Sequence, residues 1–140
     1  MTPKKKPVFS GSDVWVLLSI AMREGGDGAD LRDIISIGDY INHAILTGPE
    51  IRRGLAKLLF AGYLRENNGR FHIAGKAKLF WRRLRNSRKP VLRVWDEWEI
   101  FLKVPSHPEP DSRTEEAQWP YPAISDEMVK QAYDEYVASF

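Results

Sequence analysis

Apolar residues recur at helical spacing along most of the chain and predict a mainly helical fold. Over 13–22 they occupy more than one stripe, so this first helix is expected to lie centrally in the core. Ser12 is its expected N-cap, because a short polar side chain can accept a hydrogen bond from the first helical turn. Asp30 is the expected cap of a second helix over 31–42, whose buried side is leucine and isoleucine.

A third helix is predicted over 48–61. Thr47 and Glu50 have the spacing of a capping box at its start, and Gly62 is suited to a left-handed position at its end. Two short strands, 63–66 and 70–73, are expected to follow. The residues between them end in Asn-Gly, which favours a tight hairpin because both residue types tolerate positive φ.

The rest of the chain predicts further helices joined by a linker. Helical spacing resumes over 77–85, and after Pro90 an aromatic-rich helix is expected to 102. We expect these two helices to pack beside the first three or against a second copy of the protein. The predicted organisation is a flexible basic arm (1–11), a helical domain with an extension (12–103), a Pro-rich acidic linker (104–124) and an amphipathic helix (125–140).

Charge is strongly divided along this pattern. The 140 residues carry a formal net charge of only +2. The segment 52–93, however, has 13 basic residues and one acidic residue, Glu66, for a charge of +12, whereas the other 98 residues sum to −10. Such a division indicates an anion-binding surface, with nucleic acid as the leading candidate. The acidic C-terminal part could lie away from that surface or fold over it.

The predicted order of three helices, a hairpin and a further helix is similar to that of a known class of domains. The third helix and its exit, 47–64, have the sequence TGPEIRRGLAKLLFAGYL, and the expected hairpin turn follows at Asn67-Asn68-Gly69. Segment 12–73 thereby resembles the winged helix-turn-helix superfamily of DNA-binding domains. The resemblance implies a mostly α fold with a small β-hairpin wing, here with a C-terminal helical extension, and a third helix that enters the major groove.

Seven basic residues are candidates for DNA contact. On the third helix, about 100° per residue puts Ile51 and Leu55 on one side and Arg53, Ala56, Lys57 and Phe60 opposite. Arg53 is the candidate for reading bases, since arginine can contact guanine through two hydrogen bonds. The candidates for phosphate or backbone contact are Arg52, Lys57, Arg65, Arg70, Lys76 and Lys78.

Other classes of function find little support in the sequence. There is no cysteine, which excludes disulfides, thiol nucleophiles and thiolate metal sites. The three histidines lack metal-ligand spacing, and no arrangement of a nucleophile with a base is visible, so we expect neither an enzyme nor a cofactor. No apolar run is long enough to span a bilayer, and a soluble cytoplasmic protein is expected.

Two functions therefore remain as hypotheses. The first is a transcriptional regulator that binds double-stranded DNA, acting as a dimer. The second is a winged-helix module that binds protein or oligomerises without DNA, because a fold does not fix a function. Glu50 at the start of the third helix and Phe60 on its outer face fit the second hypothesis.

Overall fold

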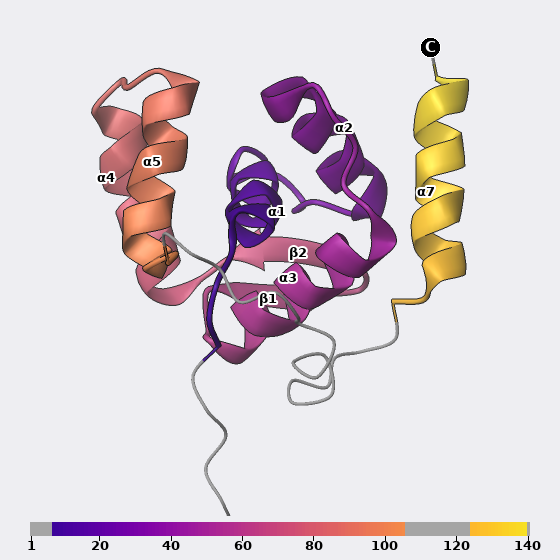
Figure 1. The fold of residues 1–140 in the computed structure, drawn as a ribbon, viewed down its shortest axis with the longest axis horizontal. Helices are drawn as coiled ribbons and strands as arrows, with labels where there is room; N and C mark the ends of the chain where they lie inside the picture. Colours follow the sequence, from indigo (N-terminus) through magenta and orange to yellow (C-terminus); the bar gives the residue numbers. More distant parts are fainter. Residues whose placement is uncertain (1–6, 106–123, 140) are drawn as a thin grey trace, which may run out of the picture.

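A computed structural model describes residues 7–105 and 124–139, which form six helices and one two-stranded hairpin (Figure 1). The mainly helical fold with a small antiparallel hairpin confirms the predicted fold class at that level. In chain order the elements are α1 (Gly11–Ala21), α2 (Leu31–Asn42), α3 (Gly48–Phe60), β1 (Leu64–Asn67), β2 (Arg70–Ile73), α4 (Gly75–Asn86), α5 (Val91–Leu102) and α7 (Asp126–Ala138).

The first helix is the centre of the core, as its apolar pattern predicts. Every residue of α1 from Asp13 to its end is buried. The helix begins earlier than expected, because Ser10 and not Ser12 is the N-cap, and the Ser10 N–H donates to Asp13 Oδ2 at 2.8 Å. Trp15 Nε1 donates to the Gly38 carbonyl oxygen at 2.9 Å, which fastens α1 to the middle of α2. A Cβ at residue 38 would lie 2.9 Å from that indole nitrogen, so only glycine permits this approach.

The predicted caps of the second and third helices are confirmed. Asp30 Oδ1 accepts from the Asp33 N–H at 2.8 Å at the start of α2. At the start of α3, Thr47 and Glu50 form the expected capping box, in which the Thr47 N–H donates to Glu50 Oε1 at 2.9 Å. Gly62 follows α3 with φ of +81°, the left-handed conformation expected of it.

The hairpin is tighter than predicted and has an additional neighbour. Its strands pair from Leu64–Ile73 to Asn67–Arg70, so the turn is the two residues Asn68 and Gly69, both with positive φ. The loop between α1 and α2 runs along the other edge of β2. There Ala29 and Phe71 exchange two backbone hydrogen bonds of 2.8 and 2.9 Å.

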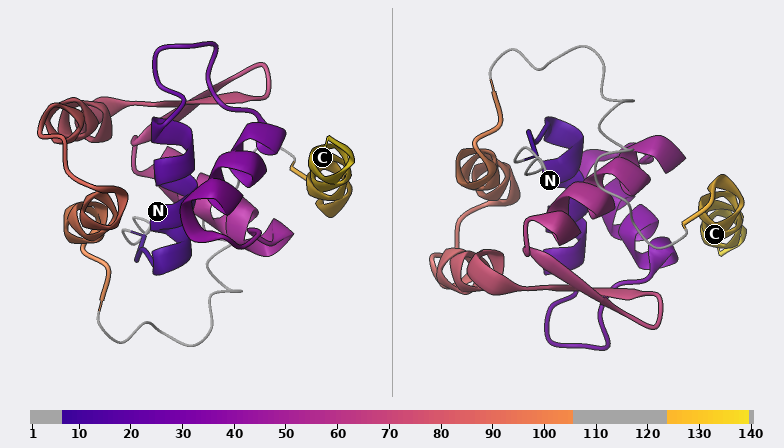
Figure 2. Two further views of the ribbon diagram at one scale, coloured as in Figure 1. Left: turned by 90° about the horizontal axis from the view of Figure 1, so that it is seen from above. Right: turned by 90° about the horizontal axis from the view of Figure 1, so that it is seen from below.

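A cluster of aromatic rings joins α4 and α5. Trp98 is fully buried, and its ring centroid lies 4.9 Å from Phe80, 5.4 Å from Phe101 and 6.2 Å from Trp81. Viewed from above, α1 lies between the α4–α5 pair and the α2–α3 pair (Figure 2). Of the two expected placements for α4 and α5, packing beside the first three helices is the one observed.

The start of the described chain is anchored, although residues 1–11 were expected to form a flexible arm. Phe9 is buried and its ring lies 6.1 Å from that of Tyr63. The Lys57 ammonium donates to the Val8 carbonyl oxygen at 3.0 Å. Residues 7–10 are therefore part of the folded domain, and only residues 1–6 of the expected arm lie outside the described residues.

The last helix packs against α2 and also touches α3 (Figure 1). Ser125 is its N-cap, and Val129 and Ala132 are the buried part of its apolar stripe. Most of the expected linker, including Trp119 and Tyr121, lies outside the described residues. Within the described part of the chain, no helix has the length and apolar character to cross a bilayer.

Removing one hydroxyl should loosen α7. The Tyr136 hydroxyl donates to Asp39 Oδ2 at 2.6 Å, and this hydrogen bond, followed by burial, raises the pKa of Tyr136 above its ordinary value. We expect Tyr136→Phe to speed amide exchange in α7 about tenfold, since a hydrogen bond to a charged group contributes about 1.5 kcal/mol. Tyr133→Phe removes the hydroxyl of a side chain that is 38% exposed on the same helix; it is the control and should leave exchange unchanged.

The raised pKa also gives this contact a pH dependence. The phenol must be protonated to donate, so its contribution is complete below the unfolded pKa of about 10 and is lost as pH rises through the higher folded value. At high pH, the amide exchange rates of α7 in the wild-type protein should therefore approach those in the Tyr136→Phe variant. A persistent difference between the two proteins would contradict this account.

Candidate nucleic-acid interface

Two of the predicted basic residues lie on the outer face of the hairpin. Side chains alternate along a strand, and Leu64, Phe71 and Ile73 point into the core between α1 and α3. Arg65 and Arg70 point to the opposite side, because they alternate with these core residues along β1 and β2. His72 pairs directly with Arg65 across the strands and shares this outer face.

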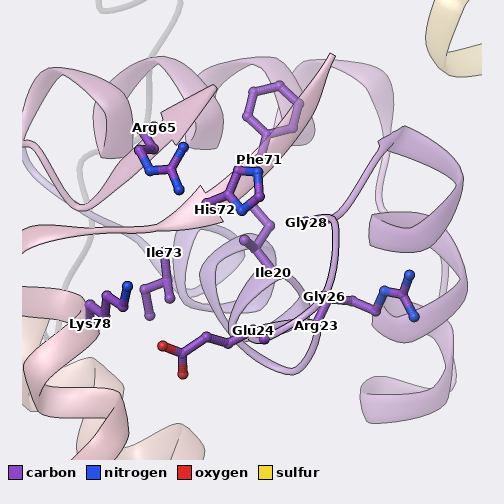
Figure 3. A pocket seen from close by; sticks show the side chains of 11 residues that line it. Ile20, Arg23, Glu24, Gly26, Gly28, Arg65, Phe71, His72, Ile73 and Lys78 are labelled. Atoms are coloured by element: carbon purple, nitrogen blue, oxygen red, sulfur yellow. The ribbon is translucent and has the colours of Figure 1, made fainter. Parts of the chain in front are cut away.

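The start of α4 adds one predicted residue to this face. Lys78 lines the same cleft as Arg65 and His72 (Figure 3). Lys76 is exposed but lies about 200° from Lys78 around the helix, and it does not join them. Arg82 and Arg85, further along α4, lie on the same side of the helix as Lys78. We call the resulting surface the wing face, formed by Arg65, Arg70, His72, Lys78, Arg82 and Arg85.

Charge on the wing face is only partly balanced. Arg82 and Arg85 lie 3.7 and 3.8 Å from the two carboxylate oxygens of Glu24. By contrast, none of the carboxylates that the structure describes lies within ion-pair distance of Arg65, Arg70 or Lys78. This face therefore presents a positive charge that is not compensated by the described part of the chain.

The electrostatics of His72 reflect that positive charge. Burial lowers the pKa of His72 below its ordinary value, and Arg65 lowers it further, as do Lys78 and Arg70. Asp27 acts in the opposite direction but does not reverse the shift. Apart from the absence of metal-ligand spacing among the three histidines, the sequence did not single out His72. Its cross-strand position opposite Arg65, which follows from the register of a two-residue turn, is the signal that would have identified it.

Lys57 is not on the outer face of α3, where the helical wheel placed it. Its side chain is only 4% exposed, and its ammonium lies 2.6 Å from Asp13 Oδ2, which is 1% exposed. Ala56, expected on the same outer face, is also buried. These two expectations are wrong because the start of α1 and residues 7–10 cover that side of α3. Lys57 is therefore placed to stabilise the domain and does not face a ligand.

The remaining candidates, Arg52 and Arg53, are half-buried near the start of α3. Helix α3 lies beside β1 on the inner side of the hairpin, whereas Arg65 and Arg70 point outward. The structure therefore separates the predicted site into two parts. Arg65, Arg70 and Lys78 come together, and the α3 arginines lie apart from them.

The described acidic helix does not cover the wing face. Helix α7 packs on α2 and α3, and its carboxylates Glu127, Asp134 and Glu135 are exposed. Met128, Gln131 and Glu135 of α7 line a shallow pocket together with Gly69 of the hairpin turn, and Figure 1 shows α7 on the side of the domain opposite α4 and α5.

Comparisons with known proteins give no match: no family model, no characterised protein and no solved structure is significantly similar to this chain. Among the described residues, no three His, Asp or Glu side chains lie close enough together to hold a metal ion.

Proposed function

We propose that the protein is a winged-helix domain that binds double-stranded DNA. The order of three helices, hairpin and helix supports the winged-helix assignment. The paired backbone of Ala29 and Phe71 supports it further, because the segment between the first two helices then runs beside the hairpin as a minimal third strand.

The observation that carries DNA binding is the uncompensated positive charge of the wing face. Phosphate contacts provide most of the affinity of proteins for DNA of any sequence. Arg65, Arg70 and Lys78 come from β1, β2 and α4, and all three lie close enough to His72 to lower its pKa, so their charges gather at one part of the surface. In this proposal these three side chains contact the DNA backbone.

Sequence recognition is assigned in this proposal to Arg53, with Arg52 beside it. Both lie in the first half of α3, the helix that enters the major groove in winged-helix proteins that bind DNA. The proposed biological role is regulation of transcription. Because α7 touches α3, the Tyr136→Phe variant also tests whether the acidic helix restrains DNA binding.

The wing face can be tested by anisotropy titrations of a duplex at two salt concentrations. Each phosphate contact contributes about 0.9 to the slope of log affinity against log salt, so Arg65→Gln with Arg70→Gln should reduce that slope by about 1.8. Arg93→Gln, which removes an exposed charge on α5, is the matched control and should leave the slope unchanged. Arg53→Ala should instead relax sequence preference by about 1–3 kcal/mol.

Absence of duplex binding at low salt would overturn the proposal and favour a protein-binding module. Phe60 on α3 is 45% exposed, and burial of Lys57 leaves α3 less basic than its sequence indicates, which fits that second function. A homodimer, which either function allows, would appear in sedimentation measurements.

A further inference from the structure

A cleft lies at the edge of the hairpin beside β2, and Ile20, Phe71 and Ile73 line it together with polar and charged side chains. Its volume is about 220 Å³, and it lies between the loop after α1 and the start of α4 (Figure 3). Arg65, His72 and Lys78 approach it from three different elements, and the backbone of the glycine-rich loop 25–28 forms its opposite side. Most drug-sized ligands occupy pockets above about 300 Å³, so this cleft suits a small group.

The loop can approach the histidine because residue 28 has no side chain. Gly28 has φ of +86°, and a Cβ there would lie 2.7 Å from His72 Cε1 and 2.9 Å from the Phe71 carbonyl oxygen. The close contact of the loop with the imidazole is therefore encoded in the sequence by this glycine.

The charges around the cleft favour an anion. Glu24 also lines it, but two guanidinium groups on α4, those of Arg82 and Arg85, lie beside its carboxylate. Arg23 extends away from the cleft, with Nε 3.8 Å from Asp33 (Figure 3). The Arg65 and Lys78 charges remain without an ion pair among the described residues.

The pKa of the His72 imidazole reflects this excess of positive charge. The pKa of His72 is lowered by burial first and by Arg65 second, with Lys78 and Arg70 adding to them against Asp27. At neutral pH the ring is therefore uncharged, and one ring nitrogen can donate a hydrogen bond while the other accepts one.

We propose that this cleft binds a phosphate group, held by Arg65, Lys78 and a ring N–H of His72. The group can belong to a small phosphorylated ligand or to a nucleic-acid backbone. Two cations from separate elements match a doubly charged group, and charge-assisted hydrogen bonds are among the strongest that proteins make. Binding of a small phosphorylated ligand does not require the protein to bind DNA.

The test is an NMR titration of the full chain that follows the His72 ring. Inorganic phosphate and sulfate are the small probes, and sulfate keeps its double charge across the pH range in which histidine titrates. A short duplex is the other arm. Bound anion should raise the pKa of His72, because it stabilises the imidazolium against Arg65, Lys78 and Arg70, and sulfate should therefore bind more tightly as pH falls.

Surface variants identify the residues responsible without threatening the fold. Arg65→Gln and Lys78→Gln should each weaken sulfate binding about tenfold, whereas Arg93→Gln should not change it. A response to small anions assigns the cleft to a small phosphorylated ligand, and a response to duplex alone assigns it to backbone phosphate. The proposal is overturned if neither arm moves the His72 pKa, or if Arg93→Gln weakens binding as much as Arg65→Gln.

Discussion

Replacing Lys57 with methionine should lower the free energy of unfolding by about 3–5 kcal/mol. The Lys57 ammonium and the Asp13 carboxylate lie 2.6 Å apart and are almost completely buried. Methionine fills a similar volume but leaves the carboxylate without its cation. Removing one partner of a buried ion pair is strongly destabilising, because the remaining charge has lost both water and its counter-ion.

The measurement is urea unfolding, with Lys89→Met as the control. Lys89 and Glu97 also form an ion pair, at 2.9 Å, but their side chains are 40% and 33% exposed. Breaking that pair should cost less than about 1 kcal/mol. Equal losses for the two variants would contradict the importance of burial.

A double variant distinguishes the stranded charge from lost packing. Asp13→Asn combined with Lys57→Met removes both charges and keeps an oxygen that can accept from the Ser10 N–H, now 2.8 Å from Asp13 Oδ2. We expect it to recover more than half of the loss. If the double variant were less stable than Lys57→Met, the stranded carboxylate could not be the cause.

The same ion pair shows why the sequence misplaced Lys57. A helical wheel orders residues around the axis of one helix, and it correctly assigned Ile51 and Leu55 to the buried side. It contains no information on how many sides of the helix have neighbours. Helix α3 is covered by α1 and also by residues 7–10, so a position opposite Leu55 is buried as well.

Features that depend on a few adjacent residues were predictable. The capping box of Thr47 and Glu50, the Asp30 cap and the Asn-Gly turn each rest on interactions within about four residues. The mainly helical fold with a hairpin follows from these signals together with the apolar spacing. The charge division also directed attention to Arg65, Arg70 and Lys78, and the structure places Arg65 and Arg70 on one face of the hairpin and Lys78 beside the same cleft as Arg65.

Features that depend on distant residues were not predictable in the same way. The cleft forms only because the loop 25–28 lies against β2, which is more than 40 residues further along the chain. Nothing near Gly28 in the sequence indicates that His72 will be its neighbour. The separation of Arg53 from Arg65 likewise follows from the side of the hairpin on which α3 packs.

Aromatic packing between α4 and α5 sets the position of Lys78, because it holds α4 against the rest of the domain. Trp98 of α5 contacts Phe80 and Trp81, which lie two and three residues beyond Lys78 on α4. We expect Trp98→Ala to lower the free energy of unfolding by about 3–5 kcal/mol, through lost burial and the cavity that remains. It should also raise amide exchange throughout α4 and α5.

Two variants of the same helix make this expectation specific. Ile100→Ala removes a side chain that is 71% exposed and should change stability by less than about 0.5 kcal/mol. Trp98→Phe keeps an aromatic ring in the cluster. It removes an indole N–H that has no hydrogen-bond partner among the described residues. The free energy of unfolding should therefore fall much less in Trp98→Phe than in Trp98→Ala. If Trp98→Ala unfolded at the same urea concentration as Ile100→Ala, the cluster would not hold α4. Sulfate binding at the cleft would then be expected to survive the Trp98→Ala change intact.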